Sequence, residues 1–501
     1  MVYLIHKKVS AIRKMRRLRF EKFKLYILIV LVITSFIQVG ILLSYQNEGL
    51  PTNFLWNIFA SNQKKVSIDL DDYVKPYRIT ATEGYDEAHF IISENHTYYD
   101  KLWNEAAYYI ASVFEDKNIE DKQIFSEEHW GEVVVKKSFI YEFKTKIGTS
   151  ILASLLNVQD VSSQGFDGIY KVAILPRVDS NNNIGLYIYD GVKTYSFVLK
   201  YKPKGLSRDD YSNMLMALEG NTDSIGYVVM RELMGKDRTP YSIKPDVLIP
   251  YGSTLEEFDD IECMVPEDIK NLHPTNNNDL ENISNKILGR DKERLTGVIE
   301  SDNSIVFRNP SKMYKINSDG LLEYKYLYQF DKSDKGKEIE ALETALKFIG
   351  GKANLVKGAD IYLSGIKDNE GGYYTFTFDY KVNQRPVSFI NYPVNSAKDS
   401  SLNNAITITA NKKKVISCYW ILKEFLVGRD KLKIMTYPLD LLEDTFVKYD
   451  YLNFSNFSVK DVSISYEAKY GTKGEKLMPV WLIESIDGKF YVVEMKKKKG
   501  D

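Results

Sequence analysis

Residues 373–389 read YYTFTFDYKVNQRPVSF, and residues 479–494 read PVWLIESIDGKFYVVE. In both stretches apolar residues alternate with polar ones, a tight polar turn follows, and the alternation resumes. A period of two is typical of antiparallel strands that bury one face. We therefore predict a β-hairpin in each stretch, and these hairpins decide the fold of the last third of the chain.

An amphipathic helix is predicted before each hairpin, over 335–351 (KGKEIEALETALKFIGG) and over 438–452 (PLDLLEDTFVKYDYL). One helix packed on a curved antiparallel sheet is the simplest arrangement that buries the apolar faces of both. We expect two such units, at 336–422 and 423–501. Whether they arose by duplication stays open, because all helix-plus-hairpin units look alike.

The region 65–255 mixes the same kinds of element and predicts an α+β domain with an antiparallel sheet. Residues 99–116 have helical spacing, and 207–220 begin with a Ser cap and end at a Gly. Asp190 and Gly191 separate two alternating runs, which is a strong hairpin signal. Further strands are expected over 132–145 and 168–178.

The segment 256–335 lies between these regions and begins with a polar stretch. This polar stretch, residues 256–289, carries the acidic run EEFDDIE at 256–262, two prolines and a run of asparagines. We predict a linker or loop with one helix at about 278–288. Strands return over 304–328, with a turn at Asp319 and Gly320.

The apolar segment 25–45 contains no formal charge. As a helix its 21 residues span roughly 31 Å, which matches a bilayer core of about 30 Å. A cleaved signal has a shorter apolar part and a small-residue cleavage site, and a buried core helix has a polar stripe. We therefore predict an uncleaved transmembrane helix, followed by a juxtamembrane connector at 46–64.

The orientation follows from residues 1–24, where nine Lys and Arg against one Glu give a net charge of +8. Short flanks rich in Lys and Arg stay in the cytoplasm. We therefore expect a cytoplasmic stub at 1–24 and the bulk of the chain outside the cell, as in a single-pass protein of the cell membrane.

Polar and small residues within the span predict a contact with another helix. Thr34 and Gln38 are four apart and share a face, while Gly40 and Ser44 form a small-xxx-small pair. The alternative is that a long membrane anchor tolerates one Gln without any contact to another helix. Aromatic anchors at the membrane interface are expected just beyond the span. They are Phe54, Trp56 and Phe59.

Charge and cysteine content exclude several classes of protein. The whole chain has a net charge of −1, so residues 25–501 sum to −9. Such an exterior lacks the clustered basic face that nucleic-acid binding needs. Cys263 and Cys418 are the only cysteines. Two distant cysteines do not make a disulfide scaffold. We expect buried free thiols, although pairing stays open.

The sequence shows no constellation of catalytic or metal-binding residues. The five His residues show no H-x-x-x-H or H-E-x-x-H spacing, and neither a P-loop nor a G-x-S-x-G motif occurs. His129 in SEEHWGE is expected in an exposed loop. Residues 179–190 partly match a calcium loop but favour a hairpin loop. We predict no catalytic residues, cofactor or metal, and a binding or regulatory module.

The chain resembles the YycH/YycI family in the order of its parts: a basic stub, one anchor, an α+β region and two helix-plus-sheet units. Its length of 501 residues is similar to that of the longer, YycH-like members. The stretches that carry the resemblance are VVVKKSFIYEFKTKIGTSILASLLNV (133–158), FDGIYKVAILPRV (166–178), IGLYIYDGVKTYSFVLKY (184–201), YYTFTFDYKVNQRPVSF (373–389) and AITITANKKKVISCYWIL (405–422).

The resemblance implies a non-enzymatic accessory protein of the WalK (YycG) sensor histidine kinase in low-GC Gram-positive bacteria, acting on cell-wall metabolism. It implies contacts with the kinase and with a YycI-like partner, as well as the lipid bilayer. It also implies C-terminal units similar to PepSY or cystatin-like folds. The sign of regulation, an exterior ligand and the oligomeric state stay open.

Two rival functions remain. A membrane-tethered cell-wall hydrolase would use carboxylates of 256–262, since paired carboxylates cleave glycosides. An exterior chaperone or protease inhibitor would act through the PepSY-like units without the helix.

Overall fold

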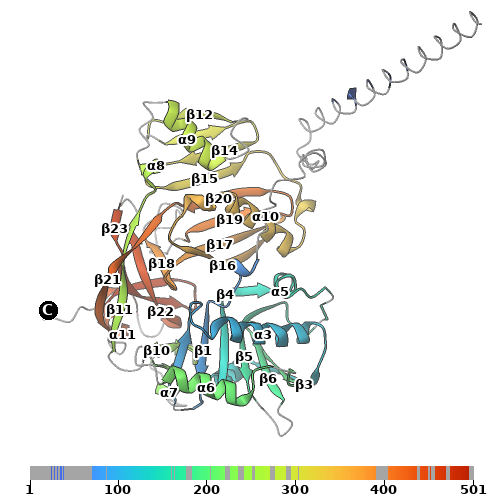
Figure 1. Ribbon diagram of the computed structural model, residues 1–501, viewed down its shortest axis with the longest axis vertical. Coiled ribbons are helices and arrows are strands. Elements are labelled where there is room, and N and C mark those ends of the chain that lie inside the picture. The colour runs from blue at the N-terminus through green and yellow to red at the C-terminus, as the bar shows by residue number, and fades with distance from the viewer. Residues whose placement is uncertain are drawn as a thin grey trace, which may run out of the picture. The chain divides into compact units, whose positions relative to one another are not determined.

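Antiparallel strands dominate the chain from Leu70 onward in the computed structural model, as the alternating sequence patterns predict (Figure 1). The chain divides into two compact units, Met1–Ser67 and Ile68–Asp501. The structure describes residues 70–495, with gaps at 86, 160, 163, 177–182, 203–204, 220–225, 235–241, 251–253, 271–276, 289–294, 303, 391–403, 437–440, 450–451, 453–456 and 470–473, and before them Lys24, Leu28, Leu31, Thr34, Ser35 and Gln38.

A nine-stranded sheet forms the first half of the second unit, in the order β10-β8-β2-β1-β4-β5-β6-β7-β3. Every neighbouring pair in it is antiparallel. Its strands are β1 Arg78–Thr82, β2 His89–Ile92, β3 Ile119–Ser126, β4 Ser138–Gly148, β5 Gly168–Leu175, β6 Ile184–Tyr189, β7 Lys193–Leu199, β8 Gly226–Val229 and β10 Leu248–Pro250.

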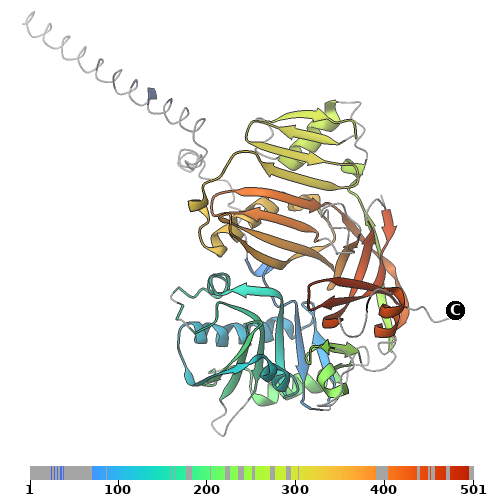
Figure 2. The same cartoon turned by 180° about the vertical axis from the view of Figure 1, so that it is seen from behind.

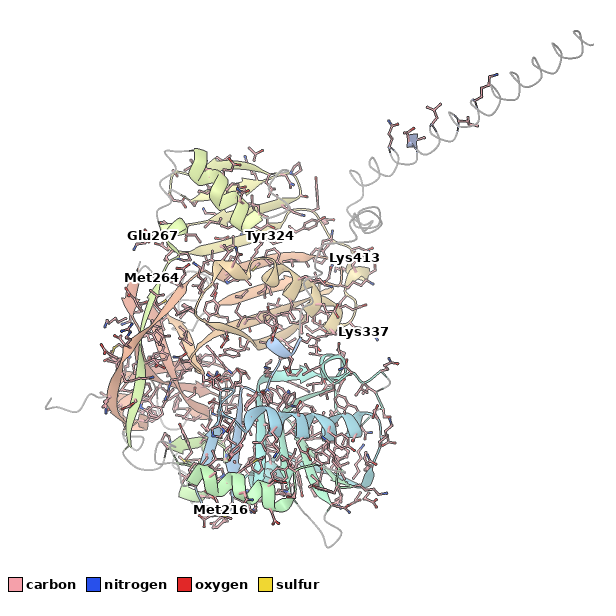
Figure 3. All side chains as sticks on the ribbon, in the orientation of Figure 1. Met216, Met264, Glu267, Tyr324, Lys337 and Lys413 are labelled. Atoms are coloured by element: carbon pink, nitrogen blue, oxygen red, sulfur yellow. The ribbon has the colours of Figure 1, made fainter. Side chains whose placement is uncertain are left out.

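Helices cover both faces of this sheet, so its central strands are apolar on both sides. On one face the Tyr141 hydroxyl donates to the Leu102 carbonyl of α3 (Tyr99–Phe114) at 3.0 Å. On the other face Trp130 of α4 (Trp130–Val133) stacks on Tyr189 at 5.4 Å. The remaining helices here are α5 Thr149–Leu155, α6 Arg208–Glu219 and α7 Met230–Met234. Figure 3 labels Met216 on α6, whose side chain is exposed.

Two sequence predictions in this region are confirmed, the hairpin turn at Asp190 and the helix cap at Ser207. The β6–β7 hairpin turns at Asp190, whose carboxylate accepts hydrogen bonds from the backbone N–H groups of Val192 and Lys193 at 2.8 and 2.7 Å. Helix α6 begins after Ser207, whose hydroxyl accepts from the Asp210 N–H at 3.1 Å. The strand expected over 132–145 is partly wrong: α4 and a turn precede β4, which begins at Ser138.

A thirteen-stranded sheet forms the second half, in the order β12-β13-β14-β15-β20-β19-β17-β18-β22-β24-β25, with β16 paired to β17 and β9 to β22. Two of its pairs, β18–β22 and β9–β22, are parallel. Its strands are β9 Ser242–Ile243, β12 Thr296–Ile299, β13 Ile305–Arg308, β14 Lys312–Ile316, β15 Leu321–Tyr326, β16 Asp360–Asn369, β17 Tyr373–Val382, β18 Arg385–Ile390, β19 Ile406–Ala410, β20 Val415–Ile421, β22 Ser458–Lys469, β24 Met478–Ser485 and β25 Phe490–Glu494.

The helices expected in the last third are present and pack on this sheet. Helix α10 (Glu338–Gly350) lies on β17, β19 and β20, and α11 (Leu441–Lys448) lies on β25. Phe348 of α10 packs on Tyr324 of β15, which Figure 3 labels, with 5.1 Å between ring centroids. The helix expected near 278–288 is α9 (Asn277–Leu288), and a short α8 spans Glu267–Lys270.

The interpretation of 256–264 as a linker is wrong. These residues belong to β11 (Thr254–Met264), which lies between β21 (Glu424–Thr436) and β23 (Gly474–Lys476) in a three-stranded sheet. Phe258, Ile261 and Cys263 are buried. A register shift between Asp259 and Ile261 breaks the alternation of apolar and polar residues. The sequence pattern therefore did not predict this strand.

Two strand pairs cross the predicted boundaries at 335 and 422, because β15 pairs with β20 and β18 pairs with β22. One sheet therefore runs through the three regions 256–335, 336–422 and 423–501. These boundaries and the PepSY-like description of the last two regions stay predictions.

Both cysteines are free and buried, as expected. Burial raises the pKa of the Cys263 thiol to about 12, so it stays protonated at neutral pH.

Little of the first unit falls within the described residues. Thr34 and Gln38 are helical and exposed, and the Thr34 hydroxyl donates to the Leu31 carbonyl at 3.0 Å. Among the residues that the structure describes, no helix is long and apolar enough to cross a membrane. The predicted span stays a prediction. Outside the described residues lie Gly40, Ser44, Phe54, Trp56 and Phe59.

Candidate functional site: a buried charge network between two sheets

Three cavities share Tyr77, which immediately precedes β1, among their lining residues. Their volumes are about 380, 70 and 30 Å³. Their walls come mainly from β1, β2, β4 and β5 of the nine-stranded sheet and from β16, β17, β18, β22 and β24 of the thirteen-stranded sheet. Figures 1 and 2 show the orange-red strands of the C-terminal third beside the blue-green nine-stranded sheet. The site therefore lies where the two large sheets meet.

Arg78 of β1 is the central cation of this site and is 8% exposed. Its Nε donates to the Glu142 carboxylate of β4. Its Nη2 donates to Asp461 Oδ1 of β22 at 3.0 Å. One guanidinium thus joins strands of both sheets. A charge at this depth is tolerated only when it is paired and hydrogen-bonded.

A second branch extends from Glu142 through the nine-stranded sheet. Glu142 Oε1 lies 2.6 Å from Lys171 Nζ of β5, and Lys171 Nζ lies 2.6 Å from Asp246 Oδ2. The same Asp246 oxygen accepts a hydrogen bond from Trp130 Nε1 at 3.1 Å. This branch therefore ties α4 and the segment before β10 to the centre of the sheet.

A third branch extends from Asp461 into β24. Lys144 Nζ of β4 lies 3.8 Å from Asp461 Oδ2 and 3.4 Å from Glu484 Oε2. Lys460 also pairs with Glu484. The network balances four cations against four carboxylates. Its members are Arg78, Lys144, Lys171, Lys460, Glu142, Asp246, Asp461 and Glu484.

The pKa shifts in the network follow from this pairing. Burial disfavours the charged form of Glu142, but Arg78 and Lys171 outweigh it and lower its pKa to about 2. Lys144 and Lys460 likewise outweigh burial and lower the pKa of Glu484. Both carboxylates are therefore ionised at neutral pH.

The lowered pKa of Glu142 predicts acid lability. Its ordinary pKa of 4.5 falls to about 2 in the folded chain. The stabilisation is thus fully present above the ordinary pKa and is lost as the pH falls toward the folded one. The loss is on the order of 3 kcal/mol. Urea unfolding at pH 7, 5 and 3 follows this loss, of which about 2 kcal/mol should be seen by pH 3. The variant Glu142→Gln should show a flatter pH dependence, and an unchanged dependence would contradict the assignment to Glu142.

Lys381 of β17 forms a second contact between the sheets and is 3% exposed. Its Nζ lies 5.0 Å from the ring centroids of both Tyr77 and Tyr362, and 3.6 Å from Glu94 Oε1. Burial lowers the pKa of Lys381, and the aromatic faces with Glu94 offset that cost.

The largest cavity combines apolar walls with polar groups. Fourteen residues line it, among them two arginines, and none of the fourteen is a carboxylate. Its volume falls in the range of roughly 300–1,000 Å³ that is typical of ligand sites. The lining residues are Tyr77, Arg78, Ile91, Ser93, Tyr227, Pro250, Asn383, Gln384, Arg385, Pro386, Val462, Ser463, Ile464 and Trp481.

The acidic run considered for catalysis does not line this site. The run belongs to β11, and three of its carboxylates pair with lysines of neighbouring strands: Asp259 with Lys431, Glu257 with Lys433 at 3.0 Å, and Asp260 with Lys476 at 2.8 Å. Ion pairs of this kind are typical of a cross-strand surface.

Two further candidates for chemistry came from the sequence. In the loop at 179–190, residues 179–182 lie outside the described residues. His129 is half-buried, not in an exposed loop as expected: it stacks on Phe125 at 4.0 Å, and its Nδ1 lies 3.2 Å from Glu132 Oε2. Within the described part of the chain, no three His, Cys, Asp or Glu side chains are grouped so that they could hold a metal ion.

Sequence reasoning missed the whole network. The available signal was the presence of Glu142, Lys144 and Lys171 inside strands that are otherwise apolar, in SFIYEFKT and GIYKVAIL. Charged residues are rarely buried unless paired, so such strands predict partners elsewhere. They do not reveal which residues those partners are.

A solved structure matches this chain over nearly the whole of the solved structure's own length. It is the crystal structure of YycH from Bacillus subtilis, which is 12% identical and covers 85% of this chain and 98% of YycH, with a TM-score of 0.52. The chain has the fold of YycH. The resemblance inferred from the sequence is thus confirmed at the level of the fold, including the mixed α+β class with antiparallel sheets.

A second solved structure is less similar to this chain than YycH is. An uncharacterized protein from Eubacterium rectale is 13% identical and covers 58% of this chain and 93% of its own, with a TM-score of 0.31. No family model and no curated protein matches the chain.

Proposed function

We propose that the chain is a non-catalytic, membrane-anchored regulator of a sensor histidine kinase of the WalK (YycG) kind, acting on cell-wall metabolism. The observation that carries this proposal is the YycH fold over 85% of the chain. The segment 25–45 supports it, because an apolar stretch of that length suits a bilayer span.

The proposed mechanism is a shift in the conformational populations of the kinase. The transmembrane helix contacts a kinase helix through Thr34, Gln38, Gly40 and Ser44, since small and polar residues allow close approach and interhelical hydrogen bonds. The aromatic residues at 54, 56 and 59 hold the helix end at the membrane interface. The bulk lies outside the cell, where a YycI-like protein is the second partner.

The buried charge network suits such a role. A regulator that couples an exterior surface to a helix needs parts that move together, because a signal travels through rigid, packed elements. Arg78 and Lys144 of the nine-stranded sheet both reach Asp461 of the other large sheet. The exterior part therefore acts as one body.

The helix contact is tested by the double variant Gln38→Leu, Gly40→Leu. We expect the kinase recovered by crosslinking and pull-down from membranes to fall about tenfold, a typical size for one such coupling. The change in kinase output should follow. The variant Leu28→Ile, Leu31→Ile is the matched control, because it changes the same helix without altering polarity. Equal recovery of the kinase with both variants would refute the helix contact.

A further inference from the structure

The largest of the three cavities that Tyr77 lines borders part of an open edge of β22, from Val462 to Ile464. On one side β22 pairs with β24 along nearly its whole length. On the other side it pairs with β9 at Ser458 and Val459 and with β18 from Tyr466 to Lys469. Between these pairs, residues 460–465 have no strand partner on that side among the described strands. Six residues of strand extend roughly 20 Å.

The lining residues show that this edge borders the cavity. Val462, Ser463 and Ile464 are consecutive, and all three line it. Since successive side chains of a strand point to opposite faces, three in a row line one cavity only where the cavity borders the strand edge. Tyr227 of β8 and Pro250 of β10, the edge strand of the nine-stranded sheet, also line the cavity, and β10 contacts β22.

Arg78 supplies a donor at one end of this edge. Its guanidinium has five N–H groups, and hydrogen bonds to Glu142 and Asp461 use Nε and Nη2. Nη1 has no partner among the residues that the structure describes. Neither Glu142 nor Asp461 lines the cavity, whereas Arg78 does. The unused donors of a buried guanidinium favour an acceptor group in the cavity. Because Arg385 also lines the cavity and no carboxylate does, the lining favours an acceptor that carries a negative charge.

We propose that this cavity binds a short extended peptide with a free α-carboxylate. The peptide adds to the edge of β22 through main-chain hydrogen bonds, and its carboxylate accepts from Arg78 Nη1. Because Arg78 contacts Asp461, near the start of the open stretch, the peptide runs antiparallel to β22. Its side chains pack against Ile91, Ile464 and Trp481, which line the cavity. This site does not depend on the proposed kinase partner.

The test uses the purified full chain, immobilised and exposed to two pools of randomised pentapeptides, one with free C-terminal carboxylates and one with C-terminal amides. We expect retention of a subset of the acids, read by mass spectrometry. Titration of a retained acid against its own amide should show at least about tenfold weaker binding of the amide, the size expected for a lost hydrogen bond to a charged group. This ligand pair tests the carboxylate without altering Arg78.

Two variants locate the binding site. Ser93 lines the cavity and is half-buried, so Ser93→Trp should fill it and reduce binding at least about tenfold. Ser301 is exposed in the turn after β12, so Ser301→Trp should bind as the unaltered chain does. Retention of neither pool, equal affinity for acid and amide, or binding unaffected by Ser93→Trp would overturn the proposal.

Discussion

Replacing Arg78 with glutamine is expected to lower the free energy of unfolding by about 3–5 kcal/mol. The substitution removes the cation that pairs with Glu142 and Asp461, so the buried Glu142 and the partly buried Asp461 each lose a partner. Breaking one side of a buried ion pair is costly because the remaining charge is uncompensated. Urea unfolding followed by circular dichroism measures the loss.

Lys315 provides the matched control for this prediction. It also bridges two carboxylates, Glu300 at 2.6 Å and Asp302 at 3.2 Å, but those carboxylates are exposed. The variant Lys315→Gln should therefore cost less than about 1 kcal/mol. If Arg78→Gln and Lys315→Gln destabilised the chain equally, the network would have no special role in joining the sheets.

The second large effect is expected at Gly358, which precedes β16. Its φ is +76°, and a Cβ there would lie 2.0 Å from the Phe425 carbonyl oxygen of β21. An alanine would have to adopt a strained backbone and displace another strand. We expect Gly358→Ala to lower the free energy of unfolding by about 4 kcal/mol, the sum of backbone strain and overpacking. Thermal and urea unfolding both report it.

A variant at Gly488 separates the cost of backbone strain from the cost of overpacking. Its φ is +81°, but a Cβ there would meet nothing within 4 Å. Gly488→Ala should therefore cost only the backbone strain, about 1 kcal/mol. A cost at Gly358 no greater than that at Gly488 would mean that β21 does not pass as closely to Gly358 as described.

Elements specified by neighbouring residues could be predicted from the sequence. The α10 helix has an apolar stripe, and the β6–β7 hairpin has Asp190 to accept from its own turn. Strand β11 could not, because its acidic composition imitates a solvated loop and its register shift breaks the alternation. The pairing of β18 with β22 depends on residues about 80 positions apart, which no local pattern encodes.

The candidate site was beyond local reasoning for the same reason. Arg78 and Asp461 are 383 positions apart in the sequence and meet only when both sheets have formed. The residues that the sequence did single out, such as Gln38 and Gly40, belong to the predicted membrane helix and to its proposed contact with another chain. Sequence and structure thus point to different parts of the chain.

The measurement that tests the central claim most directly is autophosphorylation of the sensor kinase in proteoliposomes, with and without the full chain inserted beside it. We predict that the chain changes the rate about tenfold, in one direction, and that Gln38→Leu, Gly40→Leu abolishes the change while Leu28→Ile, Leu31→Ile preserves it. An autophosphorylation rate that stays the same at every ratio of chain to kinase would contradict the account.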